Sequence, residues 1–102
     1  MSHSPFDTGL DKGLANYTPL SPMGFLKRSA LVFPDKTAII YGDRCYRYAE
    51  FYARSRRLAS ALSLRGIGAG DTVAVMAPNI PEMLECHFGV PMLRAVLNPI
   101  NY

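Results

Sequence analysis

The chain has 102 residues, 49% of them hydrophobic and 19% charged, which allows one modest core and excludes two ordinary domains. Its formal charge of +3 is scattered along the sequence, so no basic block indicates a nucleic-acid partner. Cys45 and Cys86 lack a CxxC spacing, and no apolar stretch has the length of a secretory signal or a membrane span. These features predict a cytoplasmic protein with free thiols and leave its oligomeric state open.

The amino-terminal segment differs in composition from the rest of the chain. Residues 1–17 are rich in Ser, Gly, Asp and Asn and have too few apolar side chains to offset the entropy of ordering. We therefore expect a mobile arm over 1–17 and one folded unit over 18–102. In that unit a helix is predicted to begin at Ser21-Pro22, with Ser as the N-cap and Pro in the first turn, and to end before Pro34.

Two β-rich runs follow this helix. Residues 37–41 and 44–48 are separated by Gly42-Asp43, a pair that readily adopts the positive φ of a tight turn. The sequence therefore predicts a short antiparallel hairpin.

A helical pattern covers residues 49–64. Phe51, Leu58 and Leu62 fall on one face, and Glu50 and Arg54 have the spacing of an i,i+4 ion pair. Gly66 suits the left-handed position that follows a helix, and Ile67 can contact the last turn. We predict an amphipathic helix that ends at this glycine.

The last third of the chain reads as strand, helix and strand. Residues 72–76 are continuously apolar, which is typical of a strand covered on both faces, and a second strand begins at 95–97. A helix is predicted over 80–93, with a kink at Pro91. One parallel βαβ unit with a hairpin is an incomplete doubly wound sheet, so the predicted fold class is an α/β fragment with an unpaired strand edge.

Asn79 and Glu82 have the spacing of a capping box at the start of this helix. A strand end, a polar loop and a helix N-terminus meet there, which is where open α/β sheets bind ligands. The feature is generic, and we expect it to matter only in a larger protein.

Gly66, Gly68 and Gly70 could suggest a phosphate loop, because closely spaced glycines let backbone N–H groups approach a phosphate. However, these glycines follow a helix and precede a strand, and Asp71 occupies the place of the last glycine of a dinucleotide fingerprint. We interpret the segment as a turn.

Neither a catalytic pair nor a metal site is predicted. Cys86 and His87 are adjacent on a helix, so their side chains diverge by about 100° and cannot easily share a proton. A long-range pairing of Cys45 with His87 is conceivable but has no support. With His3 in the arm, no four ligands have a recognisable metal-binding spacing.

Arginines and aromatic residues gather in the central helix and before it. The arginines could bind an anion, but no stacking series accompanies them, and a solvated helix face explains them equally well. The aromatic cluster is interpreted as packing at the junction of strand and helix. The arginines are Arg54, Arg56, Arg57 and Arg65, and the aromatic residues are Tyr46, Tyr48, Phe51 and Tyr52.

Four segments in order, residues 15–48, 48–62, 66–84 and 87–101, resemble the opening of the AMP-forming acyl-CoA synthetases. They include PDKTAII, YAEFYARSRRLASAL, GIGAGDTVAVMAPNIPEML and HFGVPM. The stretches ANYTPLSP and HFGVPM resemble the branch with medium-chain and methylmercaptopropionate CoA ligases and plant acyl-activating enzymes. Two positions depart from the family pattern: Arg47 replaces a common Thr, and Arg94 stands where many relatives have Gly.

The resemblance implies the N-terminal part of a large AMP-binding domain in an enzyme that uses ATP, Mg²⁺ and coenzyme A to convert a carboxylic acid into a thioester. None of the family's phosphate-loop, Tyr-Gly-x-Thr-Glu, ribose-binding or mobile-domain lysine motifs occurs in the chain. We therefore predict no catalytic, cofactor-binding or metal residues and no activity for the chain alone. The alternatives are an interaction module without activity and a small nucleotide-binding protein, and the misplaced glycines weigh against the second.

Overall fold

The computed structural model describes residue 9, residues 11–15 and residues 17–100. His3 and most of the predicted arm lie outside the described residues, so the mobility of the arm stays a prediction. The elements in chain order are α1 (Pro22–Val32), β1 (Thr37–Tyr41), β2 (Arg44–Arg47), α2 (Tyr48–Leu64), β3 (Thr72–Met76), α3 (Pro81–Gly89), the 3₁₀ helix η2 (Pro91–Leu93) and β4 (Val96–Ile100).

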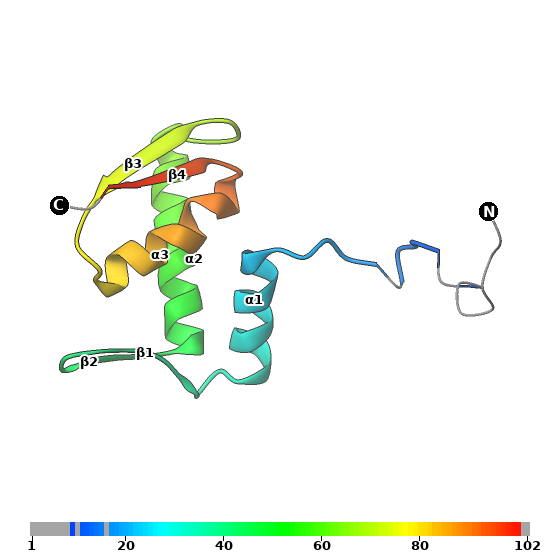
Figure 1. The fold of residues 1–102 in the computed structure, drawn as a ribbon, viewed down its shortest axis with the longest axis horizontal. Helices are drawn as coiled ribbons and strands as arrows, with labels where there is room; N and C mark the ends of the chain where they lie inside the picture. The colour runs from blue at the N-terminus through cyan, green and yellow to red at the C-terminus, as the bar shows by residue number, and fades with distance from the viewer. Residues whose placement is uncertain (1–8, 10, 16, 101–102) are drawn as a thin grey trace.

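Helix α2 is the centre of the fold (Figure 1). Helices α1 and α3 pack against it, the hairpin of β1 and β2 adjoins its first turn, and the pair of β3 and β4 lies near its other end. The described residues before α1 extend away from this body. The buried apolar side chains are those of Leu26, Phe51, Ala59, Met83, Val90 and Ala95.

The predicted start of α1 is confirmed. The Ser21 side chain accepts a hydrogen bond from the backbone N–H of Met23 at 3.2 Å, and Pro22 occupies the first turn, where its missing N–H costs nothing. Leu26 is the buried residue of this helix, whereas Phe25 and Leu31 are exposed. The apolar side of α1 is therefore only partly covered.

The predicted hairpin is also confirmed. Strands β1 and β2 pair antiparallel, from Tyr41 opposite Arg44 to Thr37 opposite Arg47, with an irregularity between Thr37 and Ile39. Gly42 has a φ of 57°, in the left-handed region that the turn requires. The second strand is one residue shorter than predicted, because Tyr48 begins α2.

Two of the three buried residues of helix α2 have small side chains. Its buried positions are Phe51, Ser55 and Ala59, one turn apart, whereas Leu58 and Leu62 are only partly buried. The predicted Glu50–Arg54 ion pair is not formed, because Glu50 accepts a hydrogen bond from the backbone N–H of Arg47 at 3.2 Å. The small side chains let another helix approach the backbone of α2 closely.

The end of α2 matches the prediction. Gly66 has a φ of 86°, its N–H donates to the carbonyl of Ser63, and the N–H of Ile67 donates to that of Leu62. These two bonds are those of a Schellman motif, which satisfies carbonyls that the helix end would otherwise leave unpaired.

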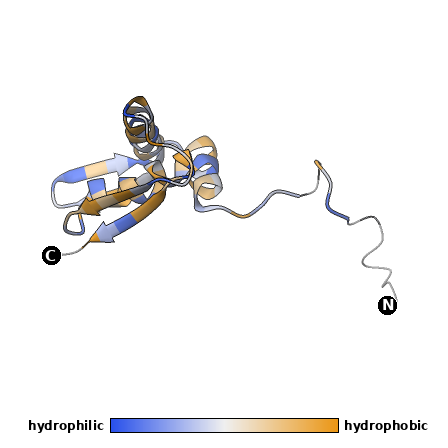
Figure 2. Cartoon of the chain, turned by 90° about the horizontal axis from the view of Figure 1, so that it is seen from above, coloured by the Kyte–Doolittle hydropathy of each residue, from blue (hydrophilic) through white to orange (hydrophobic). Residues whose placement is uncertain are grey.

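Strands β3 and β4, which precede and follow α3 in the sequence, form the predicted parallel pair, with Thr72 opposite Val96 and Met76 opposite Ile100. Strand β4 runs further than predicted and includes Pro99, which is tolerated because β4 is an edge strand among the described residues. Burial alternates along β3, so the prediction of cover on both faces is not met within the described chain. Hydrophobic stretches run along the pair (Figure 2).

The predicted capping box at α3 is wrong. Ile80 is the N-cap and makes no side-chain capping bond, because Pro81 begins the helix and leaves Asn79 one position too early. The helix is also shorter than the predicted 80–93: it ends at Gly89, and Pro91 starts the separate 3₁₀ turn η2. Pro91 lacks the N–H that a continuing helix needs, so it ends the α-helix instead of kinking it.

Arg94 has an unusual backbone conformation. Its φ of 60° and ψ of 22° place it in the left-handed region, and it is the one non-glycine residue with positive φ in the described chain. Its carbonyl accepts a hydrogen bond from the N–H of Gly70 at 3.2 Å. The conformation explains why a glycine suits this position, because glycine carries no Cβ to clash there.

Candidate functional site

A cluster of charged residues joins the hairpin, α2 and α3. Arg44 on β2 forms an ion pair with Glu82 at 2.7 Å, and Arg54 on α2 forms a second one with Glu85. Both guanidinium groups approach the Tyr46 ring, with their central carbons 5.4 and 4.7 Å from its centroid. We call these five residues the polar cluster. Glu85 is only 6% exposed, so its ion pair with Arg54 offsets part of the cost of burying the carboxylate.

The electrostatics of the polar cluster favour the charged form of Arg44, Arg54 and Glu82. The hydrogen bond from Arg44 lowers the pKa of Glu82, and the reciprocal bond raises the pKa of Arg44. The bond to Glu85 likewise raises the pKa of Arg54. Groups held in one charge state are suited to joining structural elements and poorly suited to exchanging protons.

The glycines after α2 have no N–H group to offer a phosphate. Gly66 donates to the Ser63 carbonyl, Gly68 to the Asp71 carboxylate at 2.8 Å and Gly70 to the Arg94 carbonyl. A phosphate loop needs such N–H groups directed at its ligand. The interpretation of this segment as a turn is therefore confirmed.

Cys86 and His87 do not act on one another. The Nδ1 atom of His87 lies 2.8 Å from the carbonyl oxygen of Met83, one turn earlier, and burial raises the pKa of the Cys86 thiol. A nucleophilic cysteine needs the opposite shift and a base within hydrogen-bond reach. Cys45 is exposed and forms no disulfide.

The central arginines differ in their environments. The interpretation as a solvated helix face is wrong for Arg54, which pairs with Glu85, and fits Arg56 and Arg57, which are exposed. Phe51 packs edge-on against Phe88 of α3, with ring centroids 5.3 Å apart, so this member of the aromatic cluster packs between two helices. Sequence reasoning missed the partners of the cluster because Arg54 and Glu85 are 31 positions apart.

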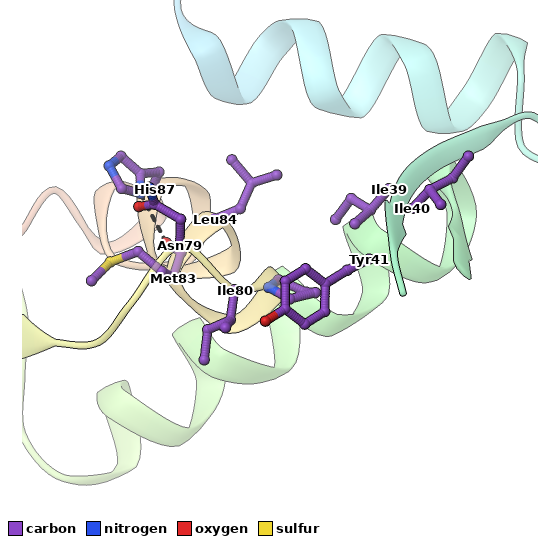
Figure 3. A pocket seen from close by; sticks show the side chains of 9 residues that line it. Ile39, Ile40, Tyr41, Asn79, Ile80, Met83, Leu84 and His87 are labelled. Carbon is purple, nitrogen blue, oxygen red and sulfur yellow. Dashed lines mark hydrogen bonds between the residues drawn. The ribbon is translucent and has the colours of Figure 1, made fainter. Parts of the chain in front are cut away.

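A pocket of about 330 Å³ lies between the hairpin and the start of α3 (Figure 3). Its lining is mostly apolar, and its polar members are Tyr41, Asn79 and His87. The sequence placed a candidate ligand position at Asn79 and Glu82, but only Asn79 reaches the pocket, since Glu82 pairs with Arg44. The pocket offers no cationic group fixed for a phosphate.

An adjoining groove of about 550 Å³ runs between α1, the hairpin, α2 and α3, and no charged side chain lines it. The pocket and the groove share Leu84. The groove residues are Leu20, Ser21, Pro22, Phe25, Leu26, Ser29, Ala38, Tyr48, Phe51, Leu84 and Phe88.

Within the described ranges, no three His, Cys, Asp or Glu side chains gather to hold a metal ion. None of the described helices is both long and apolar enough to cross a membrane.

This arrangement of three helices, a hairpin and a parallel βαβ unit belongs to a known class. The model of the family described as AMP-binding enzyme matches residues 26–102. The chain therefore belongs to the AMP-binding enzyme family, and its predicted relation to the AMP-forming acyl-CoA synthetases is confirmed.

Two similar proteins of known sequence are plant CoA ligases. The peroxisomal acetate/butyrate--CoA ligase AAE7 of Arabidopsis thaliana is 56% identical over 92 residues, and the acetate--CoA ligase CCL3 of Humulus lupulus is 51% identical over 92 residues. Each alignment covers 90% of this chain and 16% of the relative. The chain thus spans about a sixth of the length of these curated relatives.

Solved structures show the same fold. A double mutant of o-succinylbenzoate CoA synthetase (MenE) from Bacillus subtilis matches with a TM-score of 0.72 and 30% identity, over 76% of this chain and 16% of that one. The N-terminal subdomain of NpsA from Klebsiella oxytoca matches with a TM-score of 0.74 and 26% identity, over 78% of this chain and 21% of that one. The predicted fold class is confirmed by these matches.

Proposed function

We propose that the chain is the N-terminal part of an ATP-dependent acyl-CoA ligase, which converts a carboxylic acid, ATP and coenzyme A into acyl-CoA, AMP and pyrophosphate. The observation that carries this proposal is the 56% identity to an acetate/butyrate--CoA ligase across 90% of the chain. In this proposal the chain supplies scaffold, and the reacting groups are bound by residues outside it.

The described residues do not fit ATP or Mg²⁺, which supports a scaffold role. The N–H groups of Gly66, Gly68 and Gly70 are bonded within the fold, and no acidic cluster among the described residues could hold a divalent ion. The charged side chains of the polar cluster neutralise one another instead of facing a ligand. Phosphoryl and adenylyl chemistry needs cationic or N–H donors directed at the phosphates. We therefore expect the isolated chain to be inactive.

A chimera tests the proposal. Residues 1–102 would replace the aligned segment of AAE7, and acyl-CoA formation from butyrate, ATP and coenzyme A would be measured beside native AAE7. We expect the chimera to keep activity within about tenfold of native, because each 1.4 kcal/mol of lost stabilisation costs a factor of ten and a scaffold is only indirectly coupled to the barrier. A soluble, folded chimera with no activity would refute the proposal.

The isolated chain provides the complementary measurement. We expect no acyl-AMP from purified residues 1–102 with ATP, Mg²⁺ and a carboxylic acid, and no rise of the melting temperature with ATP. Acyl-AMP above the level of a blank would overturn the assignment of a scaffold role.

Two further properties are part of the proposal. The partners are a carboxylic acid, ATP and coenzyme A, with no nucleic acid. We place the protein in the cytoplasm, although AAE7 is named as a peroxisomal enzyme. Colocalisation of a fluorescent fusion of the complete gene product with a peroxisomal marker would contradict the cytoplasmic placement.

A further inference from the structure

The pocket and the groove together form one uncovered apolar surface, which we call the Leu84 surface. Leu84 belongs to both hollows and is 42% exposed, and in Figure 3 its side chain and that of Ile39 lie between α3 and the hairpin. Leu20, Phe25 and Ile40 extend this surface and are 88%, 58% and 76% exposed. A contiguous apolar area of this kind on a soluble protein marks an interaction site.

The chemistry of the Leu84 surface restricts its partner. No Lys, Arg, Asp or Glu lines either hollow, so nothing there would recognise a phosphate, a nucleic acid or a charged peptide. Depletion of charge with enrichment of large apolar and aromatic side chains is typical of permanent interfaces, which resemble a domain core cut in half. These features favour an apolar protein surface as the partner.

The parallel pair of β3 and β4 indicates what kind of protein binds the Leu84 surface. All-parallel sheets are covered on both faces, yet Met76 on β3 and Val96 on β4 are 65% and 55% exposed. The pair also has only two strands among the described residues. A sheet and a helix layer that both lack cover point to a missing part of the same domain.

The length of the relatives indicates which part of the domain could cover the Leu84 surface. The 92 aligned residues keep 56% identity to AAE7 but make up 16% of it, and the matching part of the NpsA N-terminal subdomain is 21% of that subdomain chain. We propose that the Leu84 surface binds the remainder of the AMP-binding domain of a CoA ligase, and that it does so even when the two are separate polypeptides. This inference rests on the proposed function, since it takes the partner from the same family.

Co-expression tests the inference. The chain would be produced together with the part of AAE7 that follows the aligned segment, and the purified material would be examined by size-exclusion chromatography with light scattering. We expect a one-to-one complex. Leu84→Glu and Phe25→Glu should each weaken it at least tenfold, because a charge would be buried against apolar groups.

Leu64→Glu is the matched control. Leu64 is also a helical leucine, it is 87% exposed, and it lines neither hollow. It should leave the complex unchanged. Equal weakening by the Leu64 and Leu84 substitutions would overturn the inference. So would a homodimer of the chain that Leu84→Glu dissociates, because the partner would then be a second copy.

The single-chain chimera keeps the inference testable if the AAE7 part does not fold separately. In the chimera, Leu84→Glu should lower the melting temperature by at least 5 °C more than Leu64→Glu, and equal shifts would count against a covered Leu84 surface. The two proposals fail in different ways. A complex without ligase activity would contradict the proposed function alone. An active chimera whose melting temperature falls equally with Leu84→Glu and Leu64→Glu would contradict only the inference.

Discussion

Gly89 of α3 lies directly against the backbone of Ser55 in α2: a Cβ atom added to Gly89 would be 2.9 Å from the Ser55 carbonyl oxygen and 2.9 Å from Cδ2 of Leu58. Ser55 is fully buried, and its hydroxyl donates to the Phe51 carbonyl at 2.9 Å. The two helices therefore meet where one has no side chain and the other has a small, internally satisfied one.

Gly89→Ala should lower the free energy of unfolding by about 1–3 kcal/mol, because the added methyl group meets a backbone atom that cannot move aside without shifting a helix. Urea denaturation followed by circular dichroism would measure the change. Gly24→Ala in α1 is the matched control. No atom lies within 4 Å of a Cβ added there, so the helix should gain about 0.5–1 kcal/mol. Stabilisation by both substitutions would contradict the close contact.

Arg94→Gly should raise the free energy of unfolding by about 1 kcal/mol. The left-handed conformation costs a non-glycine residue about 1–2 kcal/mol, and glycine avoids this cost but loses more chain entropy on folding. Arg94→Val should lower stability, since a β-branched residue is strained more at a φ of 60°. The same denaturation measurement separates the two variants. If glycine were the less stable of the two, the assigned conformation would be incorrect.

Arg54→Ala should destabilise the fold by about 2 kcal/mol, because it leaves the buried Glu85 carboxylate without its charged partner. Arg57→Ala, three residues along the same helix, is the control: Arg57 is exposed and should change stability by less than about 0.5 kcal/mol. Adding Glu85→Leu to the first variant should restore much of the loss. An additive double variant would show that the two residues are not coupled.

The ion pair of Glu82 with Arg44 predicts a dependence of stability on pH. Arg44 lowers the pKa of Glu82 in the folded state, so the contribution of the pair is present above the unfolded pKa of about 4.3 and is lost as the pH falls through the lower folded value. Melting temperatures between pH 6 and pH 3 should therefore fall less steeply in Glu82→Gln than in the native chain. Asp43→Asn, in the hairpin turn, should follow the native profile. A native slope in Glu82→Gln would count against the pair.

The two thiols should react at different rates. Cys45 is exposed, whereas Cys86 is partly buried and its thiol pKa is raised by desolvation, so less of it is thiolate at pH 8. Ellman's reagent should give a fast and a slow phase of equal amplitude. Cys45→Ser should remove the fast phase, and Cys86→Ser the slow one. Loss of the fast phase in Cys86→Ser would reverse the assignment.

Local chemistry in the sequence was enough to predict most of the elements. Three local signals each favour a single backbone conformation. They are Ser21-Pro22 at a helix start, Gly42 in a turn and Gly66 at a helix end, and the structure has each where the sequence predicted it. The start of α3 was predicted incorrectly because two local signals competed: Pro81 fixes the first helical position and so excludes Asn79 as the cap.

The contacts between elements could not be predicted in this way. The pairing of Arg54 with Glu85 and the contact of Gly89 with Ser55 depend on how α2 and α3 cross, which no local pattern specifies. Arg54 was instead assigned a local partner, Glu50, at the spacing that isolated helices favour. The glycine turn was interpreted correctly because its position after a helix and before a strand is itself a local property.

The register of the parallel pair has a consequence for the order of folding. Each pair in the ladder of β3 and β4 joins residues 24 positions apart (96 minus 72), whereas Tyr41 and Arg44 in the hairpin are 3 apart (44 minus 41). Closing the longer loop costs more chain entropy before any contact compensates it. We therefore expect the hairpin to form before β4 pairs with β3. If the Leu84 surface binds the remainder of the domain as proposed, a nascent chain exposes this surface to aggregation until that partner is available.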